Sequence, residues 1–272
     1  MRLDDYLKGE VAEIEHCTAR RLCPFGHVCG TLKSEGSVPL FPTVLEVGKG
    51  EMLWTDIRFE QRVFVIKDGL FVCIAQEAKE GELPYALYGT GIVIGAIELY
   101  APREISSLYH LRALLPSKVC SFSLDAVKSS LNKTGSTSVQ SVVSGSTLNQ
   151  SCAMFLQIKV MSRQSLRDRI ILQLLTIHEV LSRSRKNTRT LKITHEELAY
   201  LVGSDRVSVT RTLNALRDDG FISLGYVSIT LNDKLFELTE VNDEVKDMFY
   251  VQGDDSENLW EGYETDHPDT RG

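Results

Sequence analysis

The C-terminal third of the chain carries the longest helical pattern of apolar residues. Residues 166–181, LRDRIILQLLTIHEVL, place leucine and isoleucine at spacings of three and four, which predicts an amphipathic helix. Another helix is predicted after Thr194, which can form a capping box with Glu197. Gly203 then stands where a tight turn needs a permissive backbone, and a further amphipathic segment follows. These signals predict two helices joined by a short turn.

Alternation with a period of two follows this helix pair. Residues 221–223 are predicted to form a strand, residues 224–226 a turn at Gly225, and residues 227–231 a second strand. Helix, turn, helix and hairpin together predict a winged helix-turn-helix, although an ordinary helical hairpin with a solvated charged face remains an alternative. Arginines and small hydroxyls near a helix N-terminus suit the major groove of DNA. The residues concerned are Arg206, Ser208, Thr210, Arg211 and Asn214.

Short apolar runs separated by glycines dominate the region from Val44 to Phe122. Runs at 63–66, 70–75, 85–88 and 92–97 have strand length, and glycines lie at or near the intervening turns. This pattern predicts an antiparallel barrel or jelly roll. The length of 272 residues allows two modest domains, each with its own core.

The segment between these two regions has a weaker pattern. Residues 132–151 are rich in Ser, Thr, Gly and Asn, so we expect part of this stretch to be loop. A more regular helix is predicted over 148–163, with Cys152, Phe155 and Ile158 along one stripe. Residues 251–272 form an acidic tail that we expect to be disordered.

Charge is distributed unevenly along the chain. The net charge is −7, yet residues 158–234 contain thirteen Lys or Arg against eight Asp or Glu, and residues 253–272 contain seven acidic residues against one arginine. Local charge governs attraction to phosphates, so the acidic total does not exclude nucleic acid. No apolar run approaches the roughly 18 residues of a membrane span, and the N-terminus lacks a signal peptide pattern. We therefore expect a cytoplasmic protein that does not bind membranes.

Six cysteines in a reducing compartment are expected to be thiols, metal ligands or redox sensors rather than structural disulfides. Cys17, Cys23 and Cys29 fall at equal intervals of six in a segment that Pro24 and two glycines force into a loop. Such a group is typical of a soft-metal chelate that takes a fourth ligand from elsewhere. Zinc with His16 or His27, or a haem-responsive Cys-Pro motif, is an alternative. Cys73 is expected in the core, and Cys152 on a helix.

Together these features resemble the Crp/Fnr family of bacterial transcription regulators. The winged module resembles the family's DNA-binding domain, and KGEML, VFVIKDGLFV and YGTGIVIGAIEL resemble its β-roll sensor. The resemblance implies an α+β fold with an N-terminal β-roll (a jelly roll like that of cyclic-nucleotide-binding domains), a long dimerisation helix and a C-terminal winged helix-turn-helix. It implies a homodimer on a palindromic double-stranded DNA promoter, RNA polymerase as a partner, and no catalysis. The predicted parts are a cysteine-bearing segment at 1–36, the roll at 37–130, the linker and dimerisation helix at 131–164, the winged domain at 165–250 and the tail at 251–272.

In this family the second helix of the module enters the major groove, and a closing arginine in it contacts DNA. Arg211 occupies that place here, and Arg206 lies earlier in the helix. Val207 stands where many members use a glutamate to read bases, so the target sequence does not carry over. We expect Val207 to contact a thymine methyl group instead.

The resemblance argues against a cyclic nucleotide as ligand. Relatives that bind one carry a Gly-Glu pair and then an Arg-Ser or Arg-Thr pair, which hold the ribose and phosphate. Here Gly95 is followed by Ala96, and the second pair falls near Ser107 and Leu108. Arg103 or Arg112 would have to substitute for the missing arginine.

Cys120, in SKVCSFSLD after the last roll strands, resembles the remote cluster cysteine of Fnr-type oxygen sensors. The resemblance implies that Cys17, Cys23, Cys29 and Cys120 hold a [4Fe-4S] cluster that senses oxygen, nitric oxide or redox state. The spacing of five residues between Cys17 and Cys23 is wider than the familiar pattern. A roll gated by a small organic effector or haem, a zinc-stabilised interaction module, and a merely buried Cys120 remain alternatives. A structure with Cys120 sealed inside the barrel would exclude the cluster.

Overall fold

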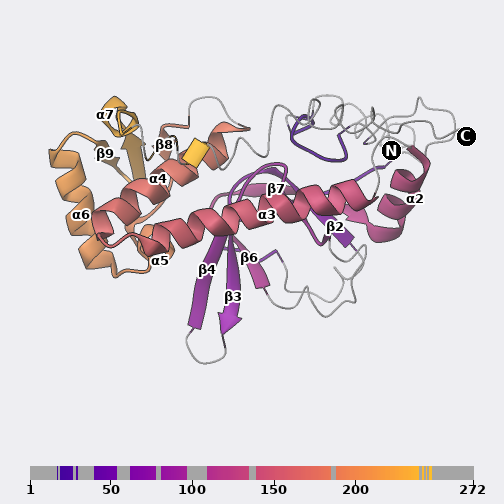
Figure 1. Ribbon diagram of the computed structural model, residues 1–272, viewed down its shortest axis with the longest axis horizontal. Coiled ribbons are helices and arrows are strands. Elements are labelled where there is room, and N and C mark those ends of the chain that lie inside the picture. The colour runs from indigo at the N-terminus through magenta and orange to yellow at the C-terminus, as the bar shows by residue number, and fades with distance from the viewer. Residues whose placement is uncertain are drawn as a thin grey trace, which may run out of the picture.

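The computed structural model describes the β-roll, the helices and the winged module, with gaps between them (Figure 1). Residues 251–272, His16, His27, Arg103, Ser107 and Leu108 lie outside the described residues, so the predictions made for them stay predictions. No helix in the described part of the chain has the length and hydropathy needed to cross a membrane. The described residues are 17, 19–26, 29, 40–53, 62–77, 81–96, 109–134, 139–184, 188–238, 241, 243, 245 and 246.

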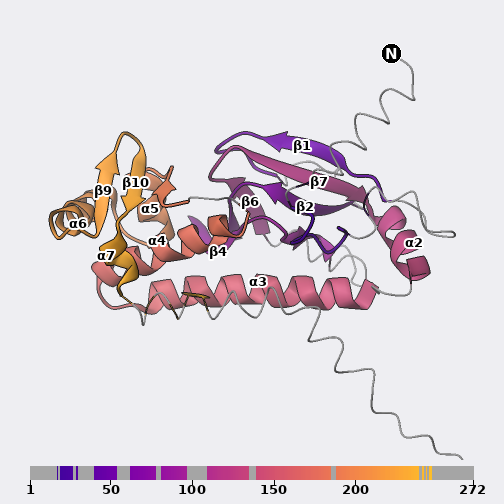
Figure 2. The ribbon, with the colours of Figure 1, turned by 90° about the horizontal axis from the view of Figure 1, so that it is seen from above.

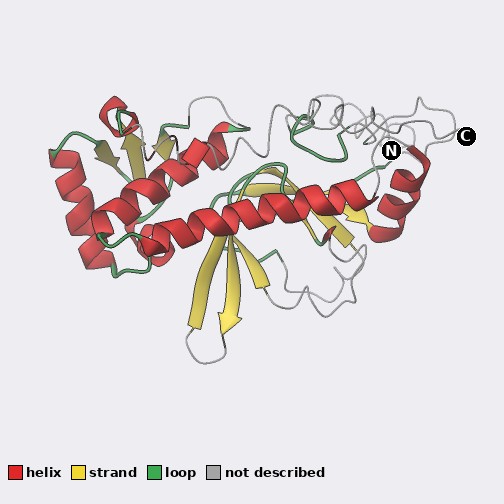
Figure 3. Cartoon of the chain, in the orientation of Figure 1, coloured by secondary structure: helices red, strands yellow, loops and turns green. Residues whose placement is uncertain are grey.

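The roll consists of two antiparallel sheets, which confirms the predicted jelly roll (Figure 3). One sheet has the order β1-β7-β2-β5, and the other has the order β4-β3-β6. Large side chains such as Phe64, Phe71 and Leu111 fill the space between the sheets. The strands are β1 (Thr43–Val47), β2 (Arg62–Asp68), β3 (Phe71–Glu77), β4 (Gly81–Tyr88), β5 (Val93–Ile94), β6 (Tyr109–Ala113) and β7 (Ser117–Ser123).

Two predictions need correction, one for the end of the roll and one for the segment after it. The segment containing Cys120 does not follow the last strand of the roll: it is that strand, β7, which lies between β1 and β2. In the Ser- and Thr-rich stretch, the helix predicted to begin at residue 148 begins earlier: α2 spans Leu124–Thr134 and α3 spans Val139–Ser162. Packing explains the second correction. Val142 and Ser146 of α3 are buried against the roll, so tertiary contacts stabilise a sequence of modest helical propensity.

Helix α3 runs along the roll and continues to the C-terminal module (Figure 2). At that end Gln157 Nε2 donates a 2.7 Å hydrogen bond to the carbonyl of Leu201. Met161 lies so close to Gly203 that a Cβ there would be 2.5 Å from its methyl carbon. The long helix is therefore packed against both the roll and the winged module.

The C-terminal module has the predicted winged helix-turn-helix order. The buried residues Ile170, Leu174, Leu175 and Ile177 of its first helix form its core, as expected. The wing differs in one detail: Gly225 ends a strand, and the turn falls at Tyr226 and Val227. The elements are α4 (Leu166–Ser182), β8 (Thr190–Leu191), α5 (His195–Leu201), α6 (Arg206–Asp218), β9 (Ile222–Gly225), β10 (Ser228–Leu231) and α7 (Asp233–Phe236), with a sheet of order β8-β10-β9.

Candidate nucleic-acid interface and cysteine cavity

Local capping interactions fix the orientation of the helix pair. Thr194 and Glu197 form the predicted capping box at the start of α5. Gly203 has a φ of +59°, a conformation that a residue with a side chain rarely adopts, and it lies in the turn before α6. The side chain of Asp205 accepts the backbone N–H of Ser208 at 2.9 Å, and these hydrogen bonds lower the pKa of Asp205. Both caps confirm that the turn was located correctly from the sequence.

Helix α6 presents a polar face to solvent because Val209, Leu213 and Leu216 are buried on its other side. The exposed face includes Val207, which is 68% exposed. Five of the six predicted DNA-binding residues border one open surface hollow of about 460 Å³: Arg206, Val207, Thr210, Arg211 and Asn214. The sixth, Ser208, is half-buried and bonds the cap instead. Contact with DNA remains a prediction for all six.

One residue that supports this face from the neighbouring helix was not identified from the sequence. His195 Nδ1 lies 2.9 Å from Thr210 Oγ1, so α5 supports a side chain of α6. Burial, and then the nearby Arg206, lower the pKa of His195, which favours its neutral form. Its position directly after the cap residue Thr194 is the only signal in the sequence. Its contact with Thr210, fifteen positions later, depends on how the two helices pack.

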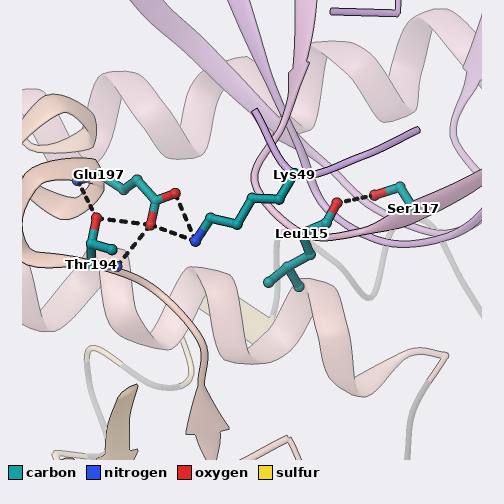
Figure 4. A network of polar contacts seen from close by, with 5 residues as sticks. All are labelled: Lys49, Leu115, Ser117, Thr194 and Glu197. Atoms are coloured by element: carbon teal, nitrogen blue, oxygen red, sulfur yellow. Dashed lines mark hydrogen bonds and ion pairs between the residues drawn. The ribbon is translucent and has the colours of Figure 1, made fainter. Parts of the chain in front are cut away.

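The roll also contacts the module directly. Lys49 Nζ lies 2.8 Å from Glu197 Oε1, and the same carboxylate accepts the backbone N–H of Thr194 at 2.7 Å (Figure 4). Arg112 of β6 forms an ion pair with Glu82 and lies 5.7 Å from the centre of the Tyr200 ring in α5. Arg112 is therefore engaged between the two parts of the molecule and is not free to replace the missing phosphate-binding arginine.

Cys120 lies on the outer face of the roll, because side chains alternate along β7. Val119 points into the core between the sheets, whereas Cys120 and Phe122 share an outer cluster with Val65 of the neighbouring strand. Phe25 of the N-terminal segment packs on this face, with its ring centre 5.1 Å from that of Phe122. Cys120 is therefore 9% exposed without being sealed inside the barrel.

The four predicted cysteines border a single cavity beneath the N-terminal segment. Cys17, Cys23 and Cys29 are half-buried and reach it from one side, and Cys120 reaches it from the sheet. The cavity volume is about 30 Å³, room for about two water molecules. A larger group would require the segment to move outward. The remaining residues around the cavity are Ala19, Arg20, Gly26, Val65, Lys67 and Phe122.

Burial favours the neutral form of Cys23, Cys29 and Cys120. It raises the pKa of Cys23 to about 12 and that of Cys29 to about 11, and neighbouring cysteines add smaller increases. Burial also raises the pKa of Cys120 to about 12, whereas Lys67 lowers it. Reactive thiols have a lowered pKa, so these three thiols do not have the character of a thiol redox switch. A bound metal would supply the positive charge that deprotonates thiols.

The spacing of the described ligands does not suit a single ion. No group of three described His, Cys, Asp or Glu residues is close enough to hold one metal ion. Four thiolates around zinc must each approach the ion to about 2.3 Å, whereas a [4Fe-4S] cluster distributes its cysteines over separate irons. Four thiols are the donor set of such a cluster, although the cavity of about 30 Å³ would have to widen to hold one. Cys73 and Cys152 lie elsewhere: Cys73 is buried inside the roll beside Tyr88, and Cys152 is buried on α3.

Comparisons with known proteins agree with this architecture. A family model described as the Crp-like helix-turn-helix domain matches residues 168–236. The transcriptional regulator SdrP of Thermus thermophilus is 37% identical over 78 residues, which cover 28% of this chain and 39% of that protein. The match thus spans less than half of that relative's length.

Two further similarities extend beyond the module. The global nitrogen regulator of Nostoc sp. PCC 7120 is 26% identical over 175 residues, covering 64% of this chain and 77% of that protein. The crystal structure of a CRP-family transcriptional regulator from Thermus thermophilus has a TM-score of 0.57 at 18% identity, covering 73% of this chain and 96% of that one. Residues 168–236 therefore form a Crp-like helix-turn-helix domain in a chain that has the fold of the CRP-family transcriptional regulators.

Proposed function

We propose that this chain is a DNA-binding transcription regulator of the Crp/Fnr type and not an enzyme. The observation that carries the proposal is the exposed face of α6, where two arginines, a valine and short polar side chains surround one hollow. In the proposed complex this face enters the major groove, with Arg206 and Arg211 on guanine edges or phosphates and Val207 on a thymine methyl group. RNA polymerase is the partner expected of such a regulator.

We further propose that α3 pairs with its counterpart in a parallel homodimer. Phe155 and Ile158 are 56% and 59% exposed, on a helix whose other side is packed against the roll and the module. Leu148, Met154 and Met161 extend the same apolar face. A helix that leaves such a stripe uncovered is suited to coiled-coil association. Dimerisation would set two recognition helices about 34 Å apart, the repeat of a palindromic site.

For the sensor, we propose a [4Fe-4S] cluster held by the four cavity cysteines. The support is that Cys120 and three cysteines about a hundred positions earlier in the chain border one buried cavity. Bound there, the cluster would supply a centre that oxygen or nitric oxide can destroy. The chain's own part is to hold the N-terminal segment against the sheet through the thiolates and through Phe25, which packs on Phe122.

A continuous apolar cluster connects the cavity to α3. Cys120, Val93 and Val142 belong to the same buried group. The carbonyl of Val93 also accepts hydrogen bonds from Ser146 Oγ at 3.0 Å and from Gln150 Nε2 at 2.7 Å. A change in how the N-terminal segment docks would therefore reach the proposed dimer helix through one layer of side chains. This path makes DNA affinity depend on the cluster in the proposed mechanism.

Iron and acid-labile sulfide measured on protein purified without oxygen test the sensor proposal. We expect about four of each per chain in the wild type and a large loss in Cys120→Ser. Cys73→Ser is the matched control, because that thiol is equally buried but lies inside the roll. Wild-type protein without iron, or with a single zinc, would refute the sensor. DNA binding is tested separately by a footprint whose affinity falls steeply with salt, and its absence would refute the regulator proposal.

A further inference from the structure

Two cationic side chains stand in the wall of the cysteine cavity. Lys67 reaches it from β2, and Arg20 reaches it from the N-terminal segment. The remaining lining, apart from the cysteines, consists of Ala19, Gly26, Val65 and Phe122, none of which carries a charge. No described residue that borders the cavity carries an acidic side chain. The described part of this wall is therefore electropositive.

Side-chain alternation along β2 places Lys67 on the cavity side of the sheet. Val63 and Val65 belong to the outer cluster that contains Cys120, and Lys67 follows at the same spacing of two. The pairing of β2 with β7 shifts in register between Ile66 and Asp68, beside this residue. Lys67 is half-buried there, although a lysine at a sheet surface usually extends into solvent. Its place on this face and its burial both point to a role inside the cavity.

The two cations act on the thiols that surround them. Lys67 and Arg20 border the same small cavity as Cys29 and Cys120, so their positive charges lie near these sulfurs. These residues therefore favour negative charge on the sulfurs, in a cavity where the apolar surroundings oppose it.

We propose that Lys67 and Arg20 are the built-in counterions of the cysteine site and control how long a cluster survives there and at what potential it is reduced. This inference rests on the cluster proposed above. Four thiolates on a doubly positive [4Fe-4S] core leave about two negative charges. Lys67 and Arg20 supply two positive charges, so the occupied cavity is neutral. A buried net charge is costly, and this pairing removes it.

The direction of the effect follows from this charge balance. Reduction of the cluster adds a negative charge and oxidation removes one, so the loss of a nearby cation disfavours reduction and eases oxidation. Replacement of either cation is therefore expected to lower the midpoint potential. It should also shorten the lifetime of the cluster in air. The chain's own cations thereby adjust its sensitivity to oxidants.

Lys67→Gln and Arg20→Gln test this inference in the full-length protein purified without oxygen. Lys118→Gln and Arg21→Gln are matched controls, because each removes the same charge from a residue of the same sheet or loop that does not border the cavity. Iron and sulfide content, the midpoint potential in a redox titration and the half-life of cluster absorbance in air are measured for each. We expect a lower potential and a severalfold shorter half-life in both test variants. Lys67→Arg should retain wild-type values.

Each result has a defined meaning. Test variants that match their controls in potential and half-life, while wild-type protein holds iron and sulfide, overturn the counterion role and leave the proposed sensor intact. Wild-type protein without iron and sulfide overturns the sensor and this inference together. If Lys67→Gln fails to fold, as judged by circular dichroism, Arg20→Gln decides the question alone because its residue lies outside the sheet.

Discussion

The recognition face of α6 and the cysteine cavity are built in opposite ways. The recognition face comes from one continuous segment and is held in place by buried residues directly behind it, such as Val209 and Leu213. The cavity is assembled from an N-terminal segment and two strands, and burial raises the pKa of Cys23, Cys29 and Cys120. One surface is therefore formed within a single segment, whereas the other joins parts of the chain that lie far apart in sequence. An occupant that bridges those parts can change how the N-terminal segment docks, which suits a sensor.

The largest expected effect is the loss of DNA affinity when the proposed dimer is broken, which leaves a single recognition face per molecule. Phe155→Lys combined with Ile158→Lys places charges on the exposed stripe of α3 and should leave a folded monomer. DNA affinity should fall by about 10²–10⁴-fold, since two linked half-site contacts become one. Sedimentation and a binding titration measure both changes. Leu156→Ala, on the buried side of α3, should instead lower the free energy of unfolding by roughly 2–5 kcal/mol. Dimers that persist in the double variant would contradict the proposed interface.

A smaller loss is expected from one side chain of the recognition face. Arg211→Ala should weaken DNA binding by roughly 5- to 150-fold, which corresponds to about 1–3 kcal/mol for a contact to a base edge, and leave iron content unchanged. Arg217→Ala is the control, since that arginine is on the same helix but is bonded to Asp218 and Asn214. Equal losses in the two variants, measured at one salt concentration, would mean that only general positive charge matters.

The difference between the two regions also explains what the sequence could predict. The helix pair depends on local signals. The cap at Thr194, the glycine at 203 and the spacing of apolar residues each determine the structure of residues within about one helical turn of them in the sequence. The β-roll was also recognisable from strand-length runs and turns. The helical state of residues 139–147 was missed, because contacts with Val93 and the roll decide it and the composition opposes it.

The cavity could be predicted only in part, since it depends on contacts distant in sequence. The four cysteines were identified by resemblance to a known pattern. They border one cavity only because Cys120 is on the outer face of β7. A shift of one residue in the register would turn Cys120 to the inner face. The contribution of Lys67 was not predictable, because the sequence does not show that the N-terminal segment covers the face of β2 that carries it. His195 was also missed, because its partner Thr210 lies on another helix.

Packing of the N-terminal segment on the roll provides a more graded test of the cavity. Gly91 has a φ of +89°, and a Cβ there would lie 2.5 Å from the carbonyl oxygen of Leu22. Gly91→Ala should therefore displace the segment and lower iron content about twofold or more, with less effect on the winged module. Gly50→Ala is matched in backbone strain, with a φ of +86°, but its Cβ would meet no atom within 4 Å. If both variants lose iron equally, strain in the roll, and not docking of the segment, determines occupancy.

The smallest expected effect concerns the ion pair between Lys49 of the roll and Glu197 of the module. Lys49→Ala removes the ion pair with Glu197 but leaves the capping box, because Thr194 still bonds the same carboxylate. The pair is partly exposed, so the free energy of unfolding should fall by less than about 1 kcal/mol.

Glu197→Ala removes both the ion pair and the cap, and should cost roughly 0.5–2 kcal/mol. Denaturant unfolding of these variants and of the double variant gives the coupling energy between Lys49 and Glu197. A loss of DNA affinity in Lys49→Ala larger than its loss of stability would show that this contact, more than α3, couples the two regions. A coupling energy below about 1 kcal/mol with unchanged DNA affinity would leave apolar packing as the principal connection, since α3 packs against both the roll and the module and α4 packs against β4.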